Sequence, residues 1–491
     1  MSNPRPPRRK PIEGALGITP ALQRKSKTRR EKQHALTEIT ARTPKLRNDL
    51  LPQLSIVRMP IDALTPAARR VRRSEEVQIE RVRASIEKFG ICAPILIGAD
   101  RRIVHGHIVW EAARRIGLSE VPAIIVDHLT PDERRALSIA LNRLGETGVW
   151  DEEMLACELE ELIDAGEDVL VTGFEEAEID ALLLPDDDPQ ADEEENIPVA
   201  TSPAISKLGD LWKLGDHLLK HGDARDPASY AALFDDGEQA RLVLTDEPYN
   251  VPNVGHVTSN AGHREFAMAA GEMSPEEFAQ FNRAWMTAAT AHLMEGGLCG
   301  TFIDWRSVGL VLAMSEEVGL VLLNFVVWVK SNAGQGSLWR SRHELLPIFK
   351  KGDAAHVNNV ELGRHGRWRS NVWFAPGASS LGSDAREGLA QHPTVKPRAL
   401  LEDALLDVTR RGEIVLDPFG GSGSTLIAAE SVGRVCRAIE IDGPYCDVII
   451  RRWQEVTGEA AVLAASGETF AEISARARLN AENEDACEGG R

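Results

Sequence analysis

The sequence predicts an α/β protein built around a doubly wound, mostly parallel sheet, with a smaller α+β domain before it. Three observations support this prediction. From about residue 207 onward, short apolar runs that suit buried strands alternate with helical patterns. Residues 413–440 read as a strand, a glycine-rich turn, a helix and a second strand. Residues 49–146 carry a separate, compact mixture of strands and helices.

Composition sets the broad class. The 491 residues are enough for two or three domains, and an apolar fraction of 43% is ordinary for a globular protein. No apolar run approaches the roughly 18 residues of a membrane span, so we expect no membrane partner and a cytoplasmic location. The six cysteines show no CxxC pair. We therefore expect free thiols and no metal site.

Charge is distributed unevenly along the chain. The net charge of -19 argues at first against a nucleic-acid partner. However, residues 151–196 hold many acids and no Lys or Arg, whereas residues 1–48 are strongly basic. DNA phosphates contact only a local part of the protein surface, and that part can be basic. The acidic net charge therefore does not exclude DNA as a partner. We expect residues 1–48 to be a disordered basic tail, either merely solvated or in contact with DNA.

The smaller domain, residues 49–146, alternates short strands with amphipathic helices. Two of the helices end at Gly90 and Gly117, and Thr130 caps a third. Its segments 103–107, 111–115 and 117–122 resemble the ParB/sulfiredoxin-like fold. The expected elements are strands at 54–59, 94–97, 102–105 and 121–126, and helices at 75–89, 107–116 and 131–144.

One turn of this domain separates it from the ParB proteins that bind CTP. Those proteins carry a Gly-x-x-Arg turn, but Val109 stands at the Arg position after Gly106. The resemblance therefore does not favour nucleotide hydrolysis. His105 and His107 lie around the same turn and suit either a phosphate contact or ordinary surface histidines.

The following segments differ sharply in composition. Residues 147–184 show helical spacing, residues 185–206 form an acidic, Pro-containing linker, and residues 460–491 form an acidic tail with a weak helix. Between them, residues 207–459 form the main domain. Its expected elements, besides those at 413–440, are a hairpin at 212–220, helices at 275–293 and 307–318, and strands at 298–304, 320–329 and 344–350.

The glycine-rich turn is the first candidate site. An apolar strand ends at Asp417, and three glycines follow before a helix begins near Thr425. Glycines let the backbone approach a ligand, and the free N–H groups of the helix start face that ligand. Glu440 ends the next strand, where an acid suits the ribose hydroxyls of a nucleotide-like ligand. A phosphate-binding P-loop is disfavoured, because no Lys precedes Ser424.

A second candidate site follows the apolar strand at 242–245, where an acid precedes Pro-Tyr. Together the two stretches resemble the DNA amino-methyltransferases that use S-adenosylmethionine (SAM), and their order resembles the β class. Residues 417–423 are similar to the SAM loop of that family, and residues 246–249 to its catalytic DPPY loop. The resemblance implies a Rossmann-like methyltransferase sheet over residues 207–459.

The resemblance also implies site residues. The catalytic loop consists of Asp246, Glu247, Pro248 and Tyr249. Lys396 lies in a segment, 392–397, that resembles the one closing over the methionine end of SAM, and Asp223 is placed at the adenine or, equally well, at a helix N-cap. The implied SAM-binding residues are Asp417, Phe419, Gly420, Gly421, Ser422, Gly423, Thr425, Glu440, Asp223 and Lys396.

The catalytic loop suits transfer of a methyl group to an exocyclic amine, whose lone pair is delocalised into the ring. Asp246 can accept one N–H of the amine, and the carbonyl of residue 247 the other, which localises the lone pair. Pro248 stiffens the turn and Tyr249 offers a face to the extruded base. Glu247 stands where the family usually has Pro, which leaves an inactive domain open.

The stretch 339–374 is the most basic part of the main domain, and three tryptophans interleave with its charges. We expect a target-recognition region at about 339–390, the alternative being an ordinary solvated face. A polar loop at 251–271 follows the catalytic turn and is expected to be a lid. The expected DNA contacts are Arg340, Arg342, Arg364, Arg367 and Arg369.

These features predict a site-specific DNA methyltransferase that acts on double-stranded DNA after base flipping. Adenine N6 is the preferred target, because Asp246 stands where many cytosine-N4 enzymes have Ser. The module at 49–146 resembles the ParB-like modules placed before phage and bacterial methyltransferases, and is expected to help hold DNA. The alternatives are cytosine-N4 methylation, a non-catalytic ParB-type DNA-binding protein, or an RNA or protein acceptor. A homodimer and a nucleoid-associated location are further expectations.

Overall fold

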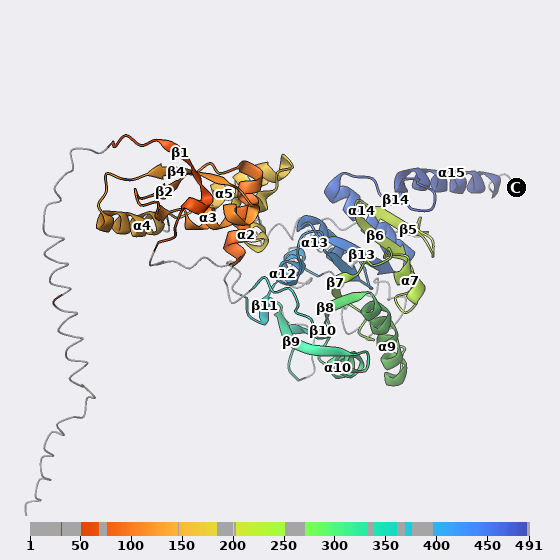
Figure 1. Ribbon diagram of the computed structural model, residues 1–491. Coiled ribbons are helices and arrows are strands. Elements are labelled where there is room, and N and C mark those ends of the chain that lie inside the picture. Colours follow the sequence, from red (N-terminus) through yellow and green to blue (C-terminus); the bar gives the residue numbers. More distant parts are fainter. Residues whose placement is uncertain are drawn as a thin grey trace, which may run out of the picture. The chain divides into compact units, whose positions relative to one another are not determined.

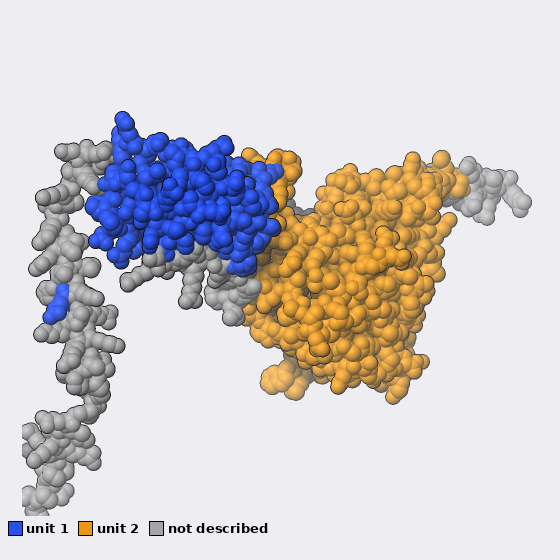
Figure 2. All heavy atoms as spheres, in the orientation of Figure 1, with its two compact units in different colours: residues 1–148 blue, residues 149–491 orange. Residues whose placement is uncertain are grey.

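The computed structural model describes residues 31, 51–67, 76–145, 147–183, 200, 203–250, 271–331, 338–360, 369–375 and 396–488. The chain divides into two compact units, residues 1–148 and 149–491 (Figure 2). Most of the basic tail lies outside the described residues. Among the described helices, none is both long enough and apolar enough to cross a membrane.

The first unit is a four-stranded sheet with helices (Figure 1). Its apolar core includes Ile97, Ile103, Trp110 and Ala123. Each expected element of residues 54–144 is present, with bounds shifted by two residues at most. The strands in sheet order are β1 (Ile56–Pro60), β4 (Glu120–Ile125), β2 (Ile95–Ile97) and β3 (Ile103–His105), and the helices are η1 (Ile61–Ala63), α2 (Glu76–Phe89), α3 (His107–Ile116) and α4 (Pro131–Gly145).

The second unit contains a ten-stranded sheet. Its five central strands, from β8 to β6, are mutually parallel, whereas β10 and β5 run antiparallel to their neighbours. The doubly wound arrangement is therefore present at the centre of a mixed sheet. The order is β11 (Val372–Phe374), β9 (Leu320–Val329), β10 (His343–Lys351), β8 (Leu293–Thr301), β7 (Ala240–Thr245), β12 (Ile414–Asp417), β13 (Val435–Glu440), β6 (His217–His221), β5 (Leu211–Leu214) and β14 (Val462–Leu463).

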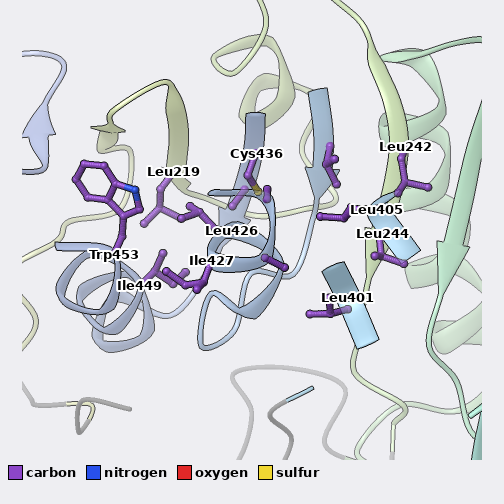
Figure 3. Close-up of a cluster of buried hydrophobic side chains, with 14 of the residues drawn as sticks. Leu219, Leu242, Leu244, Leu401, Leu405, Leu426, Ile427, Cys436, Ile449 and Trp453 are labelled. Carbon is purple, nitrogen blue, oxygen red and sulfur yellow. The ribbon is translucent and has the colours of Figure 1, made fainter. Parts of the chain in front are cut away.

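Helices cover both faces of this sheet because its central strands are apolar on both sides. Leu242 and Leu244 point to the face covered by α12, α13 and α14, where Trp453 and Ile449 are buried (Figure 3). Val243 points to the other face, with α9 and α10. The helices are α5 (Glu152–Asp164), η2 (Val169–Thr172), α6 (Glu176–Leu182), α7 (Pro227–Ala231), α9 (Pro275–Ala291), α10 (Val308–Glu317), α12 (Arg398–Val408), α13 (Ser424–Ser431), α14 (Gly443–Thr457) and α15 (Phe470–Glu488).

The main domain is longer than predicted at both ends. Strand β14 lies in the expected acidic tail, yet it pairs with β5. Phe470 at the start of α15 is buried, with its ring 5.5 Å from that of Trp212. At the other end, the backbone N–H and hydroxyl of Ser206 donate to Asp447 at 2.9 and 2.6 Å. Thus the last residues of the expected linker and the first of the expected tail belong to the folded domain.

The helical segment 147–183 is attached to the main domain through Asp180 on α6. This carboxylate is only 6% exposed and accepts from Arg434 Nη2 at 2.8 Å and from Arg411 Nε at 2.6 Å. Glu176 adds a bond from the backbone N–H of Arg411 at 2.7 Å. Arg434 is itself buried, so its charge depends on Asp180 for compensation.

We expect Asp180→Asn to destabilise the second unit by about 3–5 kcal/mol, because it leaves the Arg434 guanidinium buried without its counter-charge. The measurement is the melting temperature of the full chain. Asp164→Asn, an exposed acid at the end of α5, is the matched control. Equal melting temperatures for the two variants would contradict a stabilising role for this ion pair.

Candidate active site

The two predicted loops leave neighbouring strands at the same edge of the sheet. Strands β7 and β12 are paired in parallel, with Leu416 opposite Val243. Because parallel strands end at a common edge, the turn after Thr245 lies beside the turn that begins at Asp417. Thr245 Oγ1 donates to Asp417 Oδ1 at 2.6 Å, which joins the two turns directly.

The glycine turn is shaped by backbone bonds. Gly420 N–H donates to the Ile439 carbonyl at 2.8 Å, and Gly421 N–H to Glu440 Oε2 at 2.7 Å. Gly421 and Gly423 have φ angles of 52° and 86°, which side chains rarely adopt. A Cβ at Gly423 would also lie 3.1 Å from Ile449. The glycines therefore let the turn fold tightly against β13 and α14.

Two buried acids lie at this turn. Burial raises the pKa of Asp417 to about 7, although Thr245, Thr425 and the Phe419 N–H donate to it. Burial likewise raises the pKa of Glu440 to about 7, against the backbone N–H donors of Asp442 and Gly421. Both carboxyls therefore change protonation near neutral pH.

Around Asp246 the side chains form a charged cluster. Lys396 Nζ forms an ion pair with Asp246 and lies 3.3 Å from Glu344 Oε2. Tyr249 OH donates to Asp246 Oδ1 at 2.6 Å, and Lys330 forms an ion pair with Glu344. Burial raises the pKa of Asp246, although Lys396 opposes the shift. Lys396, expected at the cofactor, thus contacts the catalytic loop.

Glu344 was not among the predicted site residues. It lies within an apolar stretch, HELLPIF, that predicted only a strand. The one signal in the sequence for a role of Glu344 was that an acid stands within an apolar strand. Buried carboxylates are normally paired or functional. Its partners come from chain positions 249, 330 and 396, and no spacing in the sequence links them.

Glu247 is buried more deeply than any other residue of the catalytic loop, at 1% exposure. Among the described residues, no other residue donates to either of its carboxyl oxygens. Burial raises the pKa of Glu247 well above its usual value. Burial therefore favours the uncharged form of this residue, and Pro248 follows it as in the family pattern.

Several other predicted residues have contacts of their own. The Phe419 ring packs against Phe281 and Trp285, 5.7 and 5.6 Å away. Asp223, just after β6, forms an ion pair with Arg225 at 2.7 Å. The carbonyl of Ser422 accepts from Arg452 Nη1 at 3.0 Å. The contacts of Phe419 and Ser422 hold the glycine turn against α9 and α14.

The predicted DNA contacts are only partly described. Arg340 and Arg342 are exposed, and Arg342 Nε donates to the Lys330 carbonyl at 2.7 Å. Arg369 instead lies against Trp373 and forms ion pairs with Asp403 and, at 2.8 Å, Asp407, so it fastens the segment before β11 to α12. Arg364, Arg367, residues 251–270 of the lid and residues 376–390 lie outside the described residues.

We expect Glu247→Met to stabilise the protein by about 1–3 kcal/mol, because it removes an unpaired buried carboxyl. The gain grows as pH rises above 4.5, since only the unfolded chain then ionises freely at this position. Melting temperatures at pH 5 and pH 8 test this, with the exposed Glu455→Met as control. A gain that shrinks with pH would contradict the assignment.

Comparison with known families matches three parts of the chain. The family model described as DNA methylase matches residues 240–451. The ParB N-terminal domain matches residues 47–143, and the ParB-methyltransferase HTH domain matches residues 153–208. The last match spans the helices α5 and α6 and the segment that joins them to the main domain.

Individual relatives agree with the family match. The chain is 30% identical over 230 residues to the type II methyltransferase M2.DpnII of Streptococcus pneumoniae, covering 44% of this chain and 82% of that protein. It is 26% identical over 233 residues to M2.MboI of Moraxella bovis, covering 44% and 81%. A crystal structure of an M1.HpyAVI–SAM complex matches with 21% identity and a TM-score of 0.36, covering 48% of this chain and 97% of that one. The chain belongs to the N6/N4 DNA methylase family, with a ParB N-terminal domain and a ParB-methyltransferase HTH domain preceding the methylase domain.

Proposed function

We propose that this DNA methylase moves a methyl group from SAM to the N6 amine of adenine in double-stranded DNA, at a site formed by the two adjacent turns. The observation that carries the proposal is the Thr245–Asp417 hydrogen bond, which fixes the catalytic loop next to the glycine turn. A base at Asp246 and a cofactor at the glycine turn would then be neighbours.

The residues of the glycine turn fit SAM. Glu440 is a buried carboxyl whose backbone donors lie in the turn itself, so ribose hydroxyls can replace or add to those donors. A Cβ at Gly421 would meet only the Phe419 carbonyl, 3.9 Å away, so the backbone at this glycine is open to a ligand. When bound, SAM supplies an electrophilic methyl group on its sulfonium. We assign its binding to residues 417–425, Glu440 and Asp223.

The catalytic loop prepares the amine. Asp246 accepts one N–H and the backbone carbonyl of residue 247 the other, so the nitrogen lone pair is directed at the methyl carbon. The N–C bond forms as the S–C bond breaks, and the electron pair stays on sulfur. The proton released from nitrogen passes to the Asp246 carboxylate, whose pKa is raised by burial, and then to water.

Adenine is preferred over cytosine because an Asp occupies position 246. Cytosine N4 is the second candidate, since its amine has the same donors. The exposed Arg340 and Arg342 are proposed to contact DNA, together with Arg364 and Arg367. Arg369 would have to give up its ion pairs to do so. A homodimer and a nucleoid-associated location stay predictions.

Incubation of the protein with methyl-labelled SAM and mixed-sequence duplex DNA tests the function. We expect label in DNA, recovered as N6-methyladenine after digestion to nucleosides, and a loss of about 100-fold or more in rate for Asp246→Ala. Asp164→Asn is the control. SAM binding without transfer would instead indicate a non-catalytic DNA-binding protein, and N4-methylcytosine would indicate the second candidate.

The affinity for SAM is expected to rise with pH between 6 and 8. Burial raises the pKa of Glu440 to about 7, so below pH 7 this carboxyl is largely protonated and accepts poorly from ribose hydroxyls. Binding then expels a proton, which costs up to tenfold in Kd per pH unit below 7. Titration calorimetry at pH 6, 7 and 8 measures this. Glu440→Gln should bind more weakly with a flatter pH profile, and an equally steep profile would exclude Glu440 as its cause.

A further inference from the structure

Two carboxylates from distant parts of the sequence converge on one point at the catalytic loop. Asp246 follows β7, whereas Glu344 lies on β10, and β8 separates these strands. Lys396 Nζ pairs with both carboxylates and lies 3.3 Å from Glu344 Oε2. Tyr249 OH donates to Asp246 at 2.6 Å and lies 3.3 Å from the same Oε2 atom. Both acids therefore face the position that the Lys396 ammonium occupies.

Aromatic rings complete the surroundings of this ammonium. Its Nζ lies 5.1 Å from the ring centre of Phe302 and 5.9 Å from those of Tyr249 and Trp328. Ring faces within about 6 Å attract a cation through their quadrupoles. Two carboxylates and three rings thus form one site that is complementary to a small nitrogen cation. Below, these five side chains are called the ammonium site.

The charge balance of the ammonium site depends on Lys396. Despite burial, Lys396 and Lys330 lower the pKa of Glu344 to about 2, so this carboxyl is ionised. With both lysines present, their charges match those of Asp246 and Glu344. If Lys396 leaves, one negative charge is uncompensated, because Lys330 alone faces the two carboxylates. The ammonium site then favours another cation.

The reaction of the proposed function provides such a cation. During methyl transfer the exocyclic nitrogen gains positive charge while it still carries N–H donors, so it resembles an ammonium in charge and hydrogen bonding. We propose that Glu344 is a second catalytic carboxylate. It accepts the hydrogen bond from the second N–H of the target amine, opposite Asp246 and in place of the backbone carbonyl of residue 247, at the position that Lys396 Nζ occupies. This inference rests on the proposed function.

Lys396 can vacate this place without unfolding the site. Its charge is at the end of a flexible four-carbon chain, and it precedes α12 by one residue, Pro397. Its departure leaves Glu344 paired with Lys330, which directly follows β9 and remains in position. The lysine therefore acts as a temporary occupant, and the extruded base replaces it.

Glu344→Gln tests the catalytic role, because it keeps the shape and removes the charge. In single-turnover reactions with excess enzyme, we expect the rate of methyl transfer to fall by about 100-fold, with Kd for SAM unchanged within about twofold. Glu413→Gln is the matched control: its carboxylate is 2.7 Å from Arg241 and similarly shielded, but outside the ammonium site. It should react at the wild-type rate.

A wild-type rate for Glu344→Gln would overturn the inference while leaving the proposed function intact. If the wild-type protein itself transfers no methyl group, the proposed function fails, which is a separate result. A general loss of SAM binding in Glu344→Gln would mean that the carboxylate acts on the fold, and would also count against a catalytic role.

The occupant role of Lys396 has an independent test that needs no activity. Lys396→Ala leaves the ammonium site with an uncompensated negative charge, so methylammonium chloride should bind there and raise the melting temperature, relative to equal KCl. The wild-type protein and the double variant Lys396→Ala/Glu344→Gln should show no such rise. Equal responses of all three proteins would overturn the assignment of Glu344 to the ammonium site.

Discussion

The parallel pairing of β7 with β12 is the constraint on which the rest of the site depends. It brings the ends of two strands, separated by 172 positions, to one edge, where Thr245 Oγ1 bonds Asp417. The glycine turn lies on one side of this hydrogen bond and the catalytic loop on the other. Apolar residues on both faces of β7 bury the strand between two helical layers.

Several buried acids lie near this hydrogen bond, and their pKa values are shifted in different directions. Glu344 stays ionised because two lysines accompany it, while Asp417 and Glu440 have only neutral donors and their pKa values rise to about 7. Glu247 has no donor from another described residue, and burial raises its pKa well above the usual value. Environment, and not residue type, therefore decides which carboxyls carry charge before a ligand arrives.

The sequence predicted those features that local patterns encode. Strands 242–245 and 414–417 are apolar on both faces, and the glycines at 420–423 mark a turn, so the core of the fold and both loops could be inferred. Glu344 and the Asp180–Arg434 pair could not, because each depends on partners far away in the chain. Strand β14 was missed for a related reason: two residues carry no periodicity, and only pairing with β5 makes them a strand.

The attachment of α6 determines at which end of the sheet the helical segment is bound. Arg411 and Arg434 precede β12 and β13, so Asp180 is bound at the edge of the sheet where these strands begin, while the two turns lie where they end. At about 3.3 Å per residue, a strand of six residues separates these edges by roughly 20 Å. The anchor of the helical segment is thus at the opposite end of these strands from the two turns where the proposed reaction takes place.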